Sequence, residues 1–283
     1  MDIGAAMFFT DYSMTAAALA QACEARGFES LWAPEHSHIP TSRRSPYQSG
    51  GDLPKQYYDV MDPFVSLAAA AAVTRTIKLG TGVCLVIQRD TIQTAKLVAS
   101  LDQVSGGRFL FGIGGGWNAE EMEDHGTVFR TRFKKLREQI EAMKAIWSQN
   151  KPEYHGDIVA FPPMMTWPKP MQKPHPPIIV GGAFPHAARR ALRYCDGWIP
   201  NAARHQSDVA DLLPHFRQMA AEAGRDLASC PVTIWGVSED YDRLRRYADL
   251  GIARVVLSLP PEPADKTLPV LDRWADLIRR LAA

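Results

Sequence analysis

Apolar runs of strand length alternate with helical patterns of polar and apolar residues from the start of the chain. Residues 3–9 form the first apolar run, and a helical pattern over 15–26 follows it and ends at Gly27. A glycine directly after the last periodic residue is typical of a helix C-terminus, because glycine adopts the left-handed conformation without steric penalty. The first 27 residues therefore predict one strand followed by one helix.

The same alternation continues to the end of the sequence. Asp62 followed by Pro63 has the pattern of an N-cap and a first helical position, and Gly106-Gly107 ends another helical segment. Most strand-length runs are apolar throughout, which is typical of parallel strands covered on both faces. We expect further strands over 30–36, 77–86, 108–113, 178–180, 197–200, 232–235 and 254–259, and further helices over 63–71, 91–105, 132–147, 185–194, 207–223, 241–250 and 268–281.

These segments make about eight strand-helix pairs in a chain of 283 residues, a length that single barrels reach. Right-handed crossovers close such a series into a barrel more naturally than they spread it as an open sheet. The sequence therefore predicts an α/β protein with one (β/α)8 TIM-barrel domain over 1–283.

Two insertions interrupt the alternation, one after the second strand and one after the fourth helix. Residues 151–177 contain eight prolines, which exclude regular helix, and we expect a short hairpin around Gly156. Residues 37–60 combine basic residues with tyrosines and glycines, which suits a lid over an anionic group and equally suits a solvated loop. The basic residues of this lid-like insertion are Arg43, Arg44 and Lys55.

Composition and charge mainly exclude classes of partner and location. Lys and Arg total 32 against 31 Asp and Glu, so the net charge of +1 gives no field that would attract nucleic acid or an acidic membrane. The four cysteines lie far apart, which indicates reduced thiols. No basic leader opens the chain, and no apolar run approaches the ~18 residues of a membrane span. We expect a cytoplasmic protein that acts on a small molecule, without nucleic-acid or membrane partners.

Candidate chemistry is expected after the carboxyl ends of the strands, where barrel enzymes place their catalytic groups. Glu35 and His36 end the second strand, where an imidazole could move protons near neutral pH; a solvated polar turn explains the pair as well. His38 completes an H-x-H pattern that occurs in metal-dependent hydrolase barrels. Later strand ends offer no further ligands, so we expect no metal site and keep the hydrolase as an alternative of another class.

Glycines mark two other strand ends. Gly80 and Gly82 fall within the third strand, and four glycines occupy 112–116 after the fourth. Glycine in a buried strand indicates a bulge, a close approach of backbone to a flat group, or packing against a helix. Trp117 stands where a Rossmann fingerprint needs glycine, so that site is disfavoured. A planar ring against backbone, or a mobile glycine loop, fits the 112–121 segment.

A third glycine segment follows the fifth strand and opens a helix. Backbone N–H groups at the start of a helix bind anions, and barrels often hold phosphate with a loop of this kind. Ordinary turn chemistry between a strand and a helix explains the same residues. The segment consists of Gly181, Gly182 and Ala183.

Several of these segments together resemble the luciferase-like flavin and deazaflavin oxidoreductases, and the likeness covers nearly the whole chain. They are residues 31–36, 95–108, 112–121, 177–182 and 196–198. The resemblance implies a barrel with insertions, a homodimer, and a three-ring cofactor at the strand ends with its phosphate near 181–183.

The resemblance also assigns roles to residues. It implies His36 as proton donor or acceptor with Glu35 as its polar support, and a non-prolyl cis peptide at Gly82-Val83. Trp117 stands where some deazaflavin-dependent sugar dehydrogenases have a catalytic acid, so their sugar-phosphate oxidation is not transferred. The residues expected to bind the cofactor are Thr81, Gly82, Val83, Gly115, Trp117, Asn118, Glu120, Gly181, Gly182 and Ala183.

The resemblance favours the deazaflavin F420 as cofactor, and hydride transfer between it and a small organic substrate. Two alternatives stay open on the same fold. FMN in this cleft would support a monooxygenase, and a barrel that binds a flavin without turnover would serve as a partner or storage protein.

Overall fold

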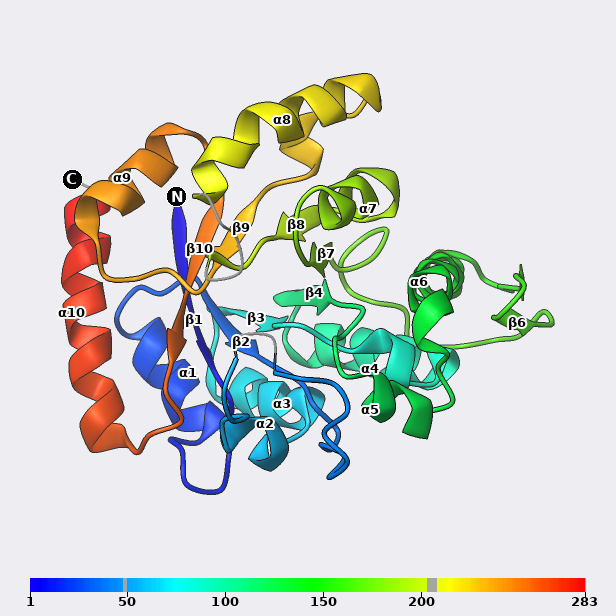
Figure 1. The fold of residues 1–283 in the computed structure, drawn as a ribbon, viewed down its shortest axis with the longest axis horizontal. Helices are drawn as coiled ribbons and strands as arrows, with labels where there is room; N and C mark the ends of the chain where they lie inside the picture. Colours follow the sequence, from blue (N-terminus) through cyan, green and yellow to red (C-terminus); the bar gives the residue numbers. More distant parts are fainter. Residues whose placement is uncertain (48–49, 203–207, 283) are drawn as a thin grey trace.

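The computed structural model describes residues 1–47, 50–202 and 208–282, and its centre is a ring of eight parallel strands (Figure 1). The strands follow the order β8-β7-β4-β3-β2-β1-β10-β9, and parallel bridges from Trp198 to Val232 and from Asn201 to Trp235 join β8 to β9. The predicted (β/α)8 TIM-barrel fold is thereby confirmed. The strands are β1 (Asp2–Met7), β2 (Ser30–Ala33), β3 (Lys78–Thr81), β4 (Phe109–Ile113), β7 (Ile178–Gly181), β8 (Gly197–Ile199), β9 (Thr233–Trp235) and β10 (Arg254–Leu259).

Helices surround the strands, as Figure 1 shows. Asp62 caps α3 by accepting hydrogen bonds from the N–H groups of Phe64 and Val65, with Pro63 in the first turn as predicted. The longer helices are α1 (Ala16–Glu24), α3 (Pro63–Val73), α4 (Thr91–Val104), α6 (Arg132–Ser148), α7 (His186–Tyr194), α8 (Val209–Glu222), α9 (Tyr241–Asp249) and α10 (Ala264–Ala282).

The barrel interior is filled by a compact apolar cluster around Trp32, which is fully buried. A Cβ on Gly80 would overlap the Trp32 ring, so this glycine lets the indole lie against the β3 backbone. Of the readings that the sequence left open for Gly80, the close approach of a flat group is therefore correct, but the group is the protein's own tryptophan. The cluster comprises Ala6, Trp32, Leu110, Ile179, Ile199 and Val256.

The structure departs from the predicted elements in a few places. Strand β3 ends at Thr81 rather than 86, because the chain then turns into the cavity described below and a 3-10 turn, Val86–Gln88. Two short helices, α2 (Gln56–Asp59) and α5 (Ala119–Asp124), were not predicted. The residue expected to begin α8, at position 207, lies outside the described residues.

The proline-rich insertion contains the predicted hairpin, formed by the antiparallel strands β5 (Tyr154–His155) and β6 (Ala160–Phe161). It projects beyond α6 in Figure 1. All four cysteines are buried and unpaired. No helix within the described ranges is long and apolar enough to cross a membrane.

Candidate active site

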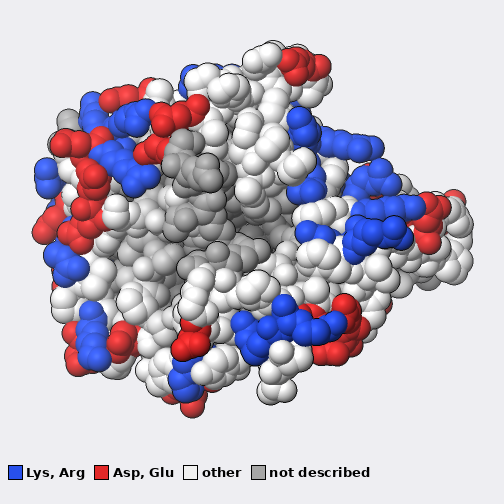
Figure 2. Space-filling view, viewed as in Figure 1, with Lys and Arg blue, Asp and Glu red and all other residues white. Residues whose placement is uncertain are grey.

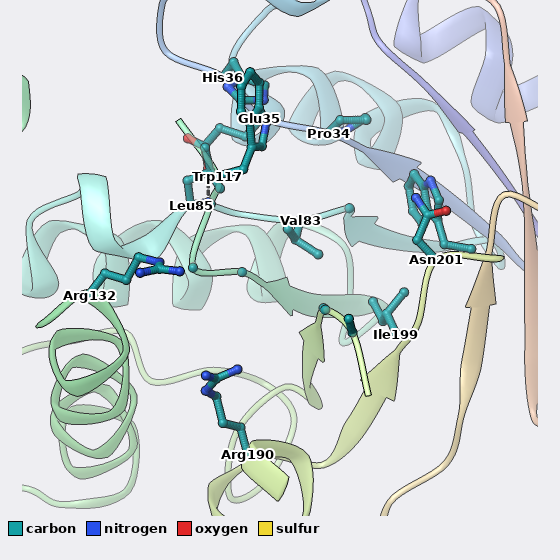
Figure 3. A pocket seen from close by; sticks show the side chains of 18 of the residues that line it. Pro34, Glu35, His36, Val83, Leu85, Trp117, Arg132, Arg190, Ile199 and Asn201 are labelled. Carbon is teal, nitrogen blue, oxygen red and sulfur yellow. Dashed lines mark hydrogen bonds between the residues drawn. The ribbon is translucent and has the colours of Figure 1, made fainter. Parts of the chain in front are cut away.

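A cavity of about 890 Å³ opens at the carboxyl ends of the strands (Figures 2 and 3). Segments that follow β2, β3, β4, β7 and β8 all contribute to its walls. Its volume falls within the roughly 300–1,000 Å³ of pockets for small molecules and cofactors. The structure brings nine predicted site residues to this one cavity: Glu35, His36, Gly82, Val83, Gly115, Trp117, Gly181, Gly182 and Ala183.

Glycines shape the floor of the cavity around the side chain of Val83. A Cβ on Gly114 would lie 2.5 Å from Val83 Cγ2, and one on Gly181 would lie 3.0 Å from Val83 Cγ1. Larger residues at either position would therefore displace Val83. The Gly82-Val83 peptide bond is cis, as the family resemblance predicted. The rings of Trp235 and Phe133 pack where a Cβ on Gly82 or on Gly115 would lie. The floor thus combines backbone with one small apolar and two aromatic side chains, a surface that a flat ring can contact.

His36 stands at the edge of this floor and is held by a buried carboxylate. Its Nδ1 lies 2.9 Å from Oε2 of Glu121, and the two side chains are 7% and 1% exposed. The other carboxylate oxygen of Glu121 accepts the N–H of Ser37 at 3.1 Å. Because a carboxylate only accepts, Nδ1 carries the proton and Nε2 is the ring nitrogen left for a ligand.

Glu35 does not support His36, which corrects the role that the resemblance implied. Its carboxylate accepts the N–H of Leu85 at 2.6 Å and Nε of Arg89 at 2.6 Å. Successive residues of an extended chain point to opposite sides, so the side chains of Glu35 and His36 diverge. Glu121 has the supporting role beside His36 that was expected of Glu35. Burial alone would lower the pKa of the Arg89 guanidinium, but the adjacent Glu35 carboxylate outweighs burial and raises that pKa.

Three residues predicted to bind the cofactor do not line the cavity. Thr81 is fully buried and donates its hydroxyl to the carbonyl of Gly112 at 2.6 Å, which ties β3 to β4. Asn118 caps α5. Glu120 points toward the lid-like insertion, where it accepts hydrogen bonds from the N–H and hydroxyl of Ser45. These side chains hold the walls of the site in place.

The lid-like insertion covers residues 37–60, of which 48 and 49 lie outside the described part. Two of its three cations form ion pairs with carboxylates. Arg44 pairs with Glu123, and Lys55 pairs with Asp59. Arg43 instead lies over the Trp117 ring, 5.9 Å from its centroid. Of the two interpretations that the sequence left open for this insertion, the ion pairs of Arg44 and Lys55 favour the solvated loop for these two residues.

Two arginines that the sequence reading missed point into the cavity from the opposite side (Figure 3). The guanidinium carbons of Arg132 and Arg190 lie 4.3 and 3.4 Å from the ring centroid of Phe133. Burial lowers the pKa of both, and the charge of Arg190 lowers that of Arg132 further. The helical pattern of 186–194 could have identified Arg190, because it lies about one turn into the helix that follows the predicted phosphate loop.

The cavity wall near His36 is aromatic. The ring centroids of Tyr57 and Trp117 lie 5.4 and 5.9 Å from that of His36, and Phe8 and Trp235 line the same cavity. Sequence patterns did not place Phe8, Tyr57 or Trp235 there, because they come from separate elements: Phe8 follows β1, Tyr57 lies in α2 and Trp235 ends β9. Such a wall excludes water and favours an apolar substrate surface.

The histidines of the H-x-H pattern contact different carboxylates. His38 pairs with Asp124 at 2.9 Å, away from the His36 pair. Among the residues that the structure describes, no group of three or more His, Cys, Asp or Glu is arranged to hold a metal ion. The hydrolase alternative therefore has no support from this geometry.

These features define the class of (β/α)8-barrel proteins with an active-site cavity at the carboxyl ends of the strands. The family model of luciferase-like monooxygenases matches residues 12–272, and the chain belongs to this family. It is 39% identical over 283 residues to an uncharacterised protein of Mycobacterium tuberculosis (97% of this chain, 98% of the other).

Other relatives are named for either cofactor. An F420-dependent hydroxymycolic acid dehydrogenase of Mycobacterium tuberculosis is 32% identical over 210 residues (73% of this chain, 54% of the other). An FMNH(2)-dependent dimethylsulfone monooxygenase of Pseudomonas putida is 36% identical over 110 residues (38% and 30%). The chain is thus an oxidoreductase of a family whose members use F420 or FMN.

Solved structures show the same fold over the whole chain. A monooxygenase from Streptomyces bottropensis superposes with a TM-score of 0.80 at 20% identity, with 100% of both chains covered. An F420-dependent secondary alcohol dehydrogenase with an F420-acetone adduct gives 0.77 at 19% identity (99% and 98%). At these identities the likeness concerns the fold alone.

Proposed function

We propose that this protein transfers hydride between the deazaflavin F420 and a small organic substrate. The observation that carries the proposal is the His36–Glu121 pair, buried at the edge of a glycine floor in a cavity of cofactor size. A relative named for F420 supports the choice of cofactor.

The cavity has the volume that such a cofactor needs. Gly82, Val83, Gly114 and Gly115 would contact the flat ring, beside the side chains of Trp235 and Phe133. The segment 181–183, which precedes α7 and lines the cavity, would lie beside the phosphate. The N–H of Gly182 donates to the carbonyl of Ile199 at 3.1 Å, so among these residues the N–H of Ala183 would be the donor to the phosphate.

A bound deazaflavin supplies a ring carbon that accepts or delivers hydride and activates oxygen poorly. His36 Nε2 accepts the proton that a substrate hydroxyl loses on oxidation, and returns it in the reverse direction. Glu121 keeps Nδ1 protonated and stabilises the imidazolium. Tyr57 and Trp117 exclude water around the imidazole and give the substrate an apolar wall.

A second candidate on the same site is an FMN-dependent monooxygenase. The Pseudomonas putida relative, which is named for FMNH(2), favours it. It differs in needing oxygen as co-substrate, so the two functions separate experimentally.

The test is a titration of the purified protein with F420 and with FMN, followed by turnover assays of a His36→Ala variant. We expect tighter binding of F420, and a turnover lower by about 10²–10⁴-fold in the variant with cofactor affinity retained. His38→Ala is the matched control, since His38 pairs with Asp124 outside the cavity. Tighter binding of FMN with oxygen-dependent turnover, or equal activities of the two variants, would contradict the proposal.

A further inference from the structure

Arg43, the third cation of the lid-like insertion, lies close to the part of the cavity that contains His36. Its guanidinium carbon is 5.9 Å from the centroid of the Trp117 ring, and the centroid of the same ring is 5.9 Å from that of His36. Trp117 and His36 line the cavity, and Arg43 lies just beyond them. One indole ring therefore separates the guanidinium from the imidazole to which we assign the proton transfer.

The charge of Arg43 is not neutralised by the protein. Within the described ranges Arg43 forms no ion pair with a carboxylate, whereas the other two cations of the insertion, Arg44 and Lys55, both do. The buried carboxylate of Glu120 faces the same insertion but accepts its hydrogen bonds from Ser45. A cation beside a cavity that lacks a carboxylate partner attracts anions to that side of the cavity.

One donor of the Arg43 guanidinium is buried without an acceptor. Its Nη1 is shielded from solvent and makes no hydrogen bond to the described residues. The indole of Trp117 attracts the cation but offers no lone pair, so the N–H groups in the guanidinium plane still require acceptors. Buried donors without a partner are uncommon in folded proteins, and carboxylates and phosphates match the guanidinium best. Nη1 therefore indicates an anionic acceptor that the protein does not supply.

The backbone at Arg43 also has an unusual conformation. Its φ is 48°, and among the residues that the structure describes no other non-glycine residue has a left-handed φ. Such conformations persist where the surrounding structure holds them, and they are frequent at ligand sites. The side chain of Arg44, the next residue, is 63% exposed. The turn therefore separates the two arginines, one over Trp117 and the other in solvent.

The space between Arg43 and His36 is bounded by aromatic rings. The centroid of the Tyr57 ring lies 5.4 Å from that of His36 and 6.5 Å from that of Trp117. The Tyr47 centroid lies 6.3 Å from that of Trp117. Such rings contact carbon chains rather than charged groups. A ligand that reaches from the imidazole to the guanidinium therefore has an uncharged carbon chain and one anionic end.

We propose that the substrate is an organic anion, a hydroxy acid or the corresponding oxo acid, whose carboxylate pairs with Arg43 while its reacting carbon lies beside His36. This inference names the substrate class for the proposed function and rests on it. On oxidation the C–H pair leaves as hydride to the cofactor, the hydroxyl proton goes to Nε2 of His36, and a C=O bond forms. The carboxylate changes no bond and fixes the orientation of the chain.

This anion site differs in place from the arginines on the other side of the cavity. Arg190 and Arg132 point into the cavity from the side opposite His36 (Figure 3). An anion held there would lie away from the imidazole. A probe that is a plain fatty acid could bind at either place, so the experiment includes a variant of each side.

The experiment titrates the cofactor-loaded protein calorimetrically with hexanoate and with hexanamide, which have the same carbon chain and differ in charge. We expect hexanoate to bind roughly 10–100-fold more tightly, because hydrogen bonds between charged groups are stronger than neutral ones in a partly buried site. In Arg43→Gln the two probes should bind equally. Arg44→Gln is the matched control and should keep the preference, since Arg44 pairs with Glu123 at the surface.

The outcomes separate this inference from the function on which it rests. Equal binding of the two probes by the wild-type protein, or a preference that survives in Arg43→Gln, would overturn the substrate class and leave the F420 titration and the His36→Ala comparison standing. A preference that is lost in Arg190→Gln and kept in Arg43→Gln would place the anion on the opposite side and would also overturn it. If F420 does not bind, the proposed function fails together with the inference.

Discussion

Replacing Glu121 with Gln should move the proton of His36 from one ring nitrogen to the other. Glu121 faces three groups: the N–H and the hydroxyl of Ser37, both on Oε1 at 3.1 and 3.5 Å, and Nδ1 of His36 on Oε2 at 2.9 Å. A glutamine offers one carbonyl oxygen and one NH₂. The backbone N–H can only donate, so it takes the carbonyl, and the NH₂ is left facing Nδ1. Nδ1 must then accept, which places the ring proton on Nε2.

With the proton on Nε2, the neutral imidazole can no longer accept one from a substrate. Substrate oxidation then loses general-base assistance, a factor of about 10²–10⁴ or roughly 3–5 kcal/mol of barrier. Glu121 is 1% exposed by side chain and is not among the cavity-lining residues, so cofactor affinity should not change. The assay is kcat for substrate oxidation, followed by deazaflavin absorbance, together with the cofactor Kd from fluorescence quenching.

The matched control is Glu123→Gln on the same helix, because Glu123 is exposed and, among the described residues, pairs with Arg44 alone. Nitrogen NMR of the imidazoles, with His36→Ala to assign the signal, reports the tautomer directly. An unchanged kcat in Glu121→Gln, or a loss of cofactor affinity in parallel with kcat, would refute the reasoning.

Two further predictions concern residues that hold the barrel. Thr81→Val should lower the free energy of unfolding by about 1 kcal/mol, because the hydrogen bond from its hydroxyl to the carbonyl of Gly112 is lost, and the cofactor Kd should not change. A higher Kd in the variant would show that Thr81 does contribute to cofactor binding. Burial would raise the pKa of Glu24, but hydrogen bonds led by the N–H groups of Thr76 and Ile77 lower it to about 2. Glu24 therefore stabilises the fold fully above pH 4.5 and loses this effect as pH falls toward 2. Urea unfolding at pH 7 should show that Glu24→Gln lowers the free energy of unfolding by about 1–3 kcal/mol. The difference between wild type and variant should shrink as pH falls from 4.5 toward 2. A difference that stays constant over this range would contradict this account.

The sequence predicted the barrel because each strand and helix carries its own local signal. Asp62 and Pro63 mark the start of α3, and apolar runs mark the strands. The two short helices were not predicted, because α5 has four acidic residues among its six and α2 has only four residues. Neither segment is long or apolar enough for a helical period to appear. The homodimer and the cytoplasmic location stay predictions.

The sequence predicted which backbone segments form the site better than it predicted how the side chains there pair. Glycines at strand ends converge in any barrel, so Gly82, Gly115 and Gly182 could be assigned to one cavity from topology. Which carboxylate would reach His36 could not be assigned, because Glu35 is adjacent in sequence whereas Glu121 approaches from a helix 85 residues away. Pairings of this kind depend on the packing of α5 against the β2 end.

The most direct test of the account is a crystal structure of the protein with F420 and a substrate analogue. We predict that the ring lies on Gly82, Val83 and Gly114, with His36 Nε2 within about 3.5 Å of the reacting oxygen of the analogue. A ring bound elsewhere in the barrel, or an imidazole turned away from the analogue with Nδ1 separated from Glu121, would contradict it.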